Sequence, residues 1–146
     1  MEKVSVFETL ASIDVSQWVE RKNGLSYLSW AHAYFQLMKH YPTSSYTVYE
    51  NEHNMMFHSD KSTCWVKVGV TVEGQEHIEY LPVMDFRNKS IPLANVTSMD
   101  VNKAVQRALT KAIARHGLGL HIYAGEDLPI SEEQPREQYQ DEGIYQ

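Results

Sequence analysis

Four basic side chains recur every four residues along one predicted helix, at Lys103, Arg107, Lys111 and Arg115. At a rise of about 1.5 Å per residue, this row extends over roughly 18 Å. A solvated helix face usually pairs lysine with glutamate one turn away, whereas residues 85–116 contain six bases and only two acids. Such a row favours an anionic partner such as the phosphate backbone of a nucleic acid, with a plain solvated face as the alternative.

Aromatic side chains near a basic row would add stacking surfaces for unpaired bases. Four rings are candidates because of their predicted strand or loop positions: Tyr27, Tyr49, Trp65 and Tyr80. Packing in the sheet or the core is the alternative interpretation for each of them. Trp30 differs, because it falls on the apolar face of a predicted helix, and we expect it in the core.

Catalytic chemistry finds little support in the sequence. No glycine-rich phosphate loop, dinucleotide fingerprint or zinc motif occurs, and the seven histidines show no ligand spacing. Asp85 and Asp100 could form a metal or acid–base pair, as in a nuclease, but the end of a strand and a helix cap also account for them. We therefore expect a binding protein rather than an enzyme, with no catalytic residue, metal or cofactor.

The basic row requires a long helix, and residues 98–116 have the pattern of one. Thr97 and Asp100 fit a capping box at its start, and Gly117 suits the left-handed conformation that ends many helices. One apolar stripe runs along the helix and is expected to pack on a core; it consists of Val101, Ala104, Val105, Ala108, Leu109, Ala112 and Ile113.

An antiparallel sheet is the predicted support for that helix. Every second residue from Val66 to Val72 is valine, with polar or aromatic residues between, which is typical of a half-buried strand. Glu73-Gly74 predicts a hairpin after this strand. The four strands are expected at residues 45–52, 55–58, 63–72 and 75–86. A further helix, capped by Ser29, is expected to end at Tyr41-Pro42.

The two ends of the chain are expected to differ. Residues 1–23 show weak helical periodicity that predicts two short helical pieces, and residues 118–123 look like one more short strand. Residues 126–146 hold seven acids and one base, whereas residues 1–125 hold 12 of each, so the net charge of −6 belongs to the last 21 residues. We expect a domain over residues 1–125 and an acidic flexible tail over residues 126–146.

Several classes of protein are excluded by composition. The single cysteine, Cys64, excludes a scaffold stapled by internal disulfides. No apolar run approaches the ~18 residues of a membrane span, and the first residues lack the pattern of a signal peptide. These observations predict a cytoplasmic protein with no membrane partner.

Several long motifs resemble one phage family, the Sak-type single-strand annealing proteins, which are distantly similar to the Rad-fifty-two annealing superfamily. The similarity covers roughly residues 24–129. It is carried by the stretch NGLSYLSWA, by VMD followed by RNK, by DVNKAVQR, by HGLGL and by YAGEDLP.

The resemblance implies a β-β-β-α core, in which an antiparallel sheet is backed by the long helix. The periodicity of residues 1–23 adds an N-terminal helical segment. The fold class we expect is therefore α+β. The resemblance also implies that residues 1–125 bind single-stranded DNA without ATP, form rings or helical filaments, and anneal complementary strands in phage recombination. Such a protein would act in the bacterial host cytoplasm during phage infection.

The resemblance also suggests site residues. In the Rad-fifty-two group, basic residues shortly before a terminal glycine of the long helix contact the DNA backbone, and Lys111 and Arg115 occupy comparable places. Arg87 and Lys89 match a motif of the family itself. The full set of candidate DNA-binding residues is Lys103, Arg107, Lys111, Arg115, Arg87, Lys89, Lys67, Tyr27 and Trp65.

The expected partners are single-stranded DNA, with RNA as the alternative polymer, other copies of the chain, and a single-strand-binding or host protein. An accessory protein that binds single strands of DNA or RNA without annealing them is the alternative function. A purely structural ring-former is a further alternative.

Overall fold

The computed structural model describes residues 4–22 and 24–124, which form an α+β fold with a four-stranded antiparallel sheet. Strand β5 (Cys64–Val72) is central and pairs along one edge with β6 (Gln75–Pro82). Its other edge pairs with β3 (Ser45–Val48) and, further along, with β4 (His58–Ser59). The hairpin predicted at Glu73-Gly74 is confirmed by the β5–β6 register, in which Val72 faces Gln75.

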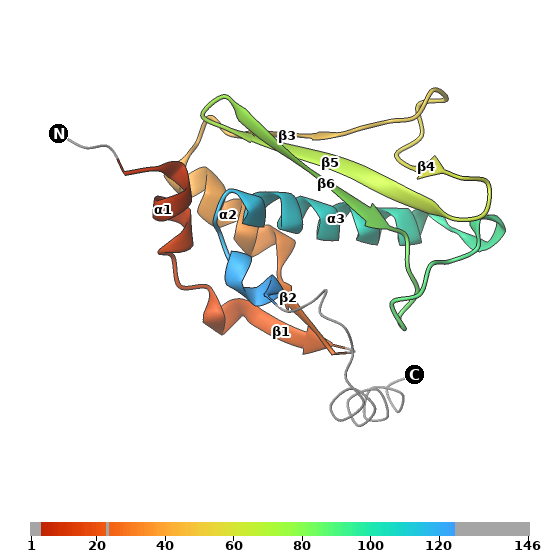
Figure 1. The fold of residues 1–146 in the computed structure, drawn as a ribbon, viewed down its shortest axis with the longest axis horizontal. Coiled ribbons are helices and arrows are strands. Elements are labelled where there is room, and N and C mark those ends of the chain that lie inside the picture. The colour runs from red at the N-terminus through yellow and green to blue at the C-terminus, as the bar shows by residue number, and fades with distance from the viewer. Residues whose placement is uncertain (1–3, 23, 125–146) are drawn as a thin grey trace.

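The long helix α3 (Ser98–Arg115) covers one face of this sheet, as Figure 1 shows. Val66, Val68 and Val70 of β5 are fully buried beneath it. The predicted alternation is confirmed, because Trp65, Lys67 and Thr71 alternate with buried residues of the strand and are only partly buried. Burial of the apolar faces of the helix and of the sheet against each other supplies the main driving force for this arrangement.

Local hydrogen bonds define where α3 begins. The Thr97 hydroxyl oxygen accepts the Asp100 N–H at 3.2 Å, and the Asp100 carboxylate accepts the Thr97 N–H at 2.9 Å. This reciprocal pair is the predicted capping box. At the other end, His116 caps the helix and Gly117 follows with a φ of +125°.

The other side of α3 is covered by the N-terminal elements (Figure 1). These are helix α1 (Val6–Ala11), the hairpin of β1 (Val19–Lys22) and β2 (Leu25–Leu28), and helix α2 (Trp30–His40). Helix α2 begins at the predicted cap Ser29, whose side chain accepts the His32 N–H. No helix in the described part of the chain is both long and apolar enough to span a membrane.

Two short helical pieces lie before residue 24, as predicted, but residues 19–22 form a strand that the sequence analysis did not predict. Only α1 is an α-helix; the second piece is a single 3₁₀ turn (Ser16–Trp18) that leads directly into β1. Strand pairing overrides the weak helical periodicity here, because β1 and β2 pair antiparallel, with Val19 facing Leu28. The turn between these strands contains Gly24, which has a φ of +80°.

The predicted strand at residues 118–123 was wrong. Leu120–Tyr123 is a 3₁₀ helix, η3. The physical reason lies in the two glycines before it, since Gly117 has a φ of +125° and Gly119 a φ of +69°. These conformations bend the chain back and remove the extended backbone that a strand needs. Leu118, between them, is fully buried in the core.

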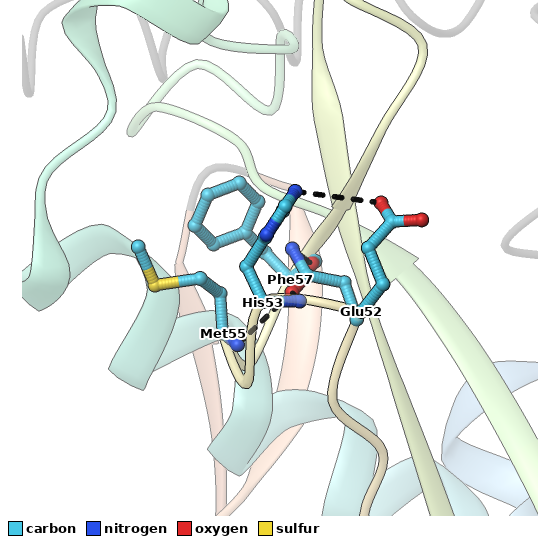
Figure 2. A network of polar contacts seen from close by, with 5 residues as sticks. Glu52, His53, Met55 and Phe57 are labelled. Carbon is cyan, nitrogen blue, oxygen red and sulfur yellow. Dashed lines mark hydrogen bonds and ion pairs between the residues drawn. The ribbon is translucent and has the colours of Figure 1, made fainter.

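The segment between β3 and β4 contains less strand than predicted. Strand β3 ends at Val48, and β4 contains only His58 and Ser59. The Asn51 side chain organises a turn instead, because its oxygen accepts the N–H groups of His53 at 2.7 Å and Met55 at 3.0 Å. Figure 2 shows this turn, in which Glu52 also forms an ion pair with His53 at 3.9 Å. Side-chain hydrogen bonds of this kind compete with strand pairing.

A buried histidine at the end of α3 makes the fold sensitive to pH. Burial lowers the pKa of His116, although the hydrogen bond from its Nε2 to the Val70 carbonyl at 2.8 Å opposes this shift; the nearby His77 adds to the lowering. The unfolded chain therefore takes up this proton more readily than the folded one. The free energy of unfolding should fall as the pH drops below about 6.5, until the folded pKa is passed.

Denaturant titrations between about pH 8 and pH 5 test this expectation. The pH dependence should become shallower in His116→Asn, whatever that change does to the absolute stability. His53→Asn is the matched control, because the His53 side chain is 78% exposed. Identical pH dependence in wild type and His116→Asn would contradict the assignment.

Candidate nucleic-acid interface

A groove with a volume of about 740 Å³ lies between α3 and the β1–β2 hairpin. The start of α2, the end of β6 with the loop that follows it, and Tyr123 of η3 complete its lining. The β1–β2 hairpin lies on the side of α3 that faces away from the four-stranded sheet (Figure 1). Elements that are far apart in the chain therefore build it together.

Three of the four cations in the helical row line this groove. Lys103, Arg107 and Lys111 reach it from α3, and Lys22 joins them from β1. Arg107 and Lys111 are partly buried, whereas Lys103 is exposed. Four cationic side chains from two elements thus gather around one open groove, where each strengthens the attraction for a polyanion.

Three carboxylates share the lining, but two of them are engaged by backbone N–H groups. Asp85 accepts the N–H of Arg87 at 2.8 Å and of Lys89 at 3.1 Å, which holds the turn after β6. Asp100 caps α3. The third, Glu20, lies 3.7 Å from the Lys22 ammonium group. Among the residues described, no group of three or more acidic, histidine or cysteine side chains could hold a metal.

Aromatic rings form much of the remaining lining, contributed by Tyr27, Trp30, Phe86 and Tyr123. The Arg107 guanidinium lies 4.9 Å from the centre of the Tyr27 ring, and the Lys111 ammonium lies 5.3 Å from that of Tyr123. These cation–π contacts hold the two cations at the groove. The structure thus brings Tyr27, one of the candidate residues, next to the basic row.

The expected position of Trp30 was wrong. We expected this residue in the core, whereas it is 41% exposed. The buried residues of α2 are Ala33, Gln36 and Leu37. The apolar face of the helix is therefore centred on these later turns. Trp30 is the first helical residue and lies at the margin of that face, where its ring lines the groove.

Arg115 does not line the groove. Its guanidinium forms an ion pair with Glu79 of β6, in which Nε donates to Oε2 and Nη2 lies 3.4 Å from Oε1. This hydrogen bond and the charge of Glu79 raise the pKa of Arg115 above its usual value. Since Glu79 is only 9% exposed, loss of Arg115 would leave a poorly solvated carboxylate, so the pair joins the end of α3 to the sheet.

The other candidate residues occupy two further places. Arg87 and Lys89 are exposed on the loop after β6, with the Arg87 guanidinium 5.5 Å from the ring of the groove-lining Phe86. Lys67 and Trp65 point from β5 to the sheet face opposite α3. There the Lys67 ammonium lies 4.6 Å from the Tyr49 ring centre, and Trp65 stacks on His58.

Sequence reasoning missed four groove residues: Lys22, Trp30, Phe86 and Tyr123. One signal could have revealed Lys22. The Asn23-Gly24 pair is a strong signal for a two-residue hairpin turn. A hairpin there would have placed Lys22 and Tyr27 on neighbouring strands. Nothing local in the sequence indicates that Phe86 or Tyr123 faces α3.

The fold and groove define an α+β domain whose long helix packs on an antiparallel sheet with one face and lines a cationic, aromatic groove with the other. The Sak single strand annealing protein model matches residues 5–145, and the chain belongs to this family. It is a single-strand annealing protein, a class that acts on single-stranded DNA. No curated protein and no solved structure matches the chain in the corresponding searches.

Proposed function

We propose that the protein binds single-stranded DNA in the groove between α3 and the β1–β2 hairpin and anneals complementary strands without ATP. The observation that carries this proposal is the convergence of Lys22, Lys103, Arg107 and Lys111 on one groove that also contains aromatic rings. The cations hold phosphates of one strand, and the rings support its bases. Arg87 and Lys89 extend the basic surface beyond the groove.

Annealing by this route needs no covalent step. A strand held by its backbone keeps its bases available, and holding two strands extended and close raises their effective concentration. The free energy comes from base pairing, which is why no nucleotide hydrolysis is required.

Self-association completes the proposal. One groove offers few cations, so a single protomer would bind a short stretch of DNA weakly. A ring or helical filament of copies would align these grooves into a continuous track whose contacts add along one strand. We propose that this assembly acts in phage homologous recombination in the host cytoplasm.

A strand-annealing assay tests the proposal. Two labelled complementary DNA oligonucleotides, mixed with protein in the absence of ATP and of divalent metal, should pair faster than without protein. The acceleration should fall steeply with rising salt, because counterions compete for the phosphates. Binding without faster pairing would instead identify a non-annealing accessory protein, and shortened oligonucleotides after added magnesium would identify a nuclease.

A further inference from the structure

The four aromatic rings that line the groove are not equivalent. The Tyr27 ring lies 4.9 Å from the Arg107 guanidinium, the Tyr123 ring lies 5.3 Å from the Lys111 ammonium, and the Phe86 ring lies 5.5 Å from the Arg87 guanidinium. Each of these three rings thus has a cation within cation–π distance. These three rings therefore hold cations that can contact phosphates.

Trp30 is different. Its side chain is 41% exposed, lines the groove, and makes no ring or cation contact with any other residue in segments 4–22 and 24–124. Exposing the largest apolar side chain to water is costly, and such exposure at a concave site is a common mark of a binding surface. An indole ring also offers a large flat face on which a nucleobase can stack.

The other two tryptophans already have stacking partners. Trp18 stacks on His32, with 3.5 Å between ring centres, and Trp65 stacks on His58, with 6.3 Å between ring centres. Neither of them lines the groove.

We propose that Trp30 is the base-stacking residue of the groove, on which an unpaired base of the bound strand lies face to face with the indole. This inference deepens the proposed function and rests on it. The Ser29 cap fixes the start of α2 by accepting the His32 N–H at 3.4 Å. The backbone that carries the indole is therefore held by a helix rather than by a loop, so less of it has to be ordered when DNA binds.

Stacking suits an annealing protein because of what it leaves uncovered. A base stacked on an indole uses its flat face and keeps its hydrogen-bonding edge free for a complementary strand. The cations that hold phosphates come from α3 and β1, and the ring comes from α2. Separate elements thus hold the backbone and one base face, and the pairing edge stays available.

Binding measurements on three proteins and two oligonucleotides test the proposal. Trp30→Ala should bind oligo-dT about 5- to 150-fold more weakly than wild type, the range expected for one lost stacked base. Trp30→Phe, the matched control that keeps a flat ring, should lose no more than about fivefold. On an abasic oligonucleotide of equal length, which has phosphates but no base faces, wild type and Trp30→Ala should bind alike.

The abasic oligonucleotide separates stacking from a structural role. An equal loss for Trp30→Ala on both oligonucleotides would overturn the proposal, because it would mean that the residue merely shapes the groove. An unchanged affinity of Trp30→Ala for oligo-dT would also overturn it.

Fluorescence gives a second readout that does not depend on affinity. In the variant Trp18→Phe/Trp65→Phe, Trp30 is the only tryptophan left, and oligo-dT should quench its emission. In Trp30→Phe/Trp65→Phe and Trp18→Phe/Trp30→Phe, oligo-dT should leave the emission nearly unchanged. Quenching confined to the protein that keeps Trp65 would place the stacked base on the opposite sheet face and contradict the assignment.

Failure of the inference can be told from failure of the proposed function. If wild type binds oligo-dT and the variant Arg107→Gln/Lys111→Gln does not, the groove is the binding site, whatever the effect of changing Trp30. If neither the change of the two cations nor Trp30→Ala alters the affinity for oligo-dT, the groove is not the binding site and the proposed function at this groove is refuted.

Discussion

Arg107→Glu combined with Lys111→Glu is expected to abolish strand annealing and to reduce single-stranded DNA binding more than any other pair of changes in the groove. Both cations line the groove, and both are placed there by contacts with Tyr27 and Tyr123. Reversing their charge removes two phosphate contacts and adds repulsion in the same place.

The neutral pair Arg107→Gln/Lys111→Gln gives a lower limit for this effect. Counterion release predicts that each phosphate contact raises the affinity for single-stranded DNA about eightfold at about 50 mM salt relative to 1 M. Losing two contacts should therefore weaken binding on the order of 60-fold. The slope of log affinity against log salt should also become shallower by about 1.4 for single-stranded DNA. Fluorescence anisotropy over a salt series measures both quantities.

A matched control must change the net charge by the same amount away from the groove. Lys39→Glu/Lys61→Glu does so, because both lysines are exposed and neither lines the groove. This control should reduce affinity only slightly at low salt. Equal losses in the control and in Arg107→Glu/Lys111→Glu would show that binding responds to net charge alone and that the groove is not the site.

Gly117→Ala is expected to give the largest loss of stability from a single methyl group. Gly117 has a φ of +125°, and a Cβ atom there would lie 2.7 Å from the Phe7 carbonyl oxygen and 3.2 Å from the Ala11 nitrogen. Both are backbone atoms of α1, so neither can move aside as a side chain would. Strain at this φ and displacement of α1 together should cost about 3–5 kcal/mol.

Gly74→Ala separates the backbone strain from the steric clash. Gly74 has a φ of +81°, but no atom beyond its two chain neighbours lies within 4 Å of the place where its Cβ would be. Its cost should therefore be only about 1–2 kcal/mol, the penalty for a left-handed conformation alone. Denaturant unfolding of both variants measures the difference. Equal costs at the two positions would mean that α1 does not pack against the end of α3.

Arg115 illustrates how pairing across the fold changes an interpretation based on spacing. Its place in the four-residue repeat is indistinguishable from that of Lys111 in the sequence. The nearly buried Glu79 on β6, however, lies under the last turn of α3 and binds the guanidinium. Spacing shows which residues share a helix face, but only the neighbours of each residue decide whether its charge is available.

The sequence by itself determined the elements whose interactions are local. The capping box at Thr97, the alternating valines of β5 and the turn at Glu73-Gly74 depend on residues within a few positions of each other, and all three are present in the fold. The motifs spread over the chain also sufficed to identify the family.

Only the tertiary structure decided which of these residues form one groove. Its walls come from β1, β2, α2, the loop after β6, α3 and η3. Several of these elements are distant in the chain, and they meet because their apolar sides share one core. That packing exposes Trp30 at the margin of α2, pairs Arg115 with the sheet, and turns Lys67 to the far face. Local patterns predict helices and strands, whereas the position of one element against another depends on contacts between residues far apart in sequence.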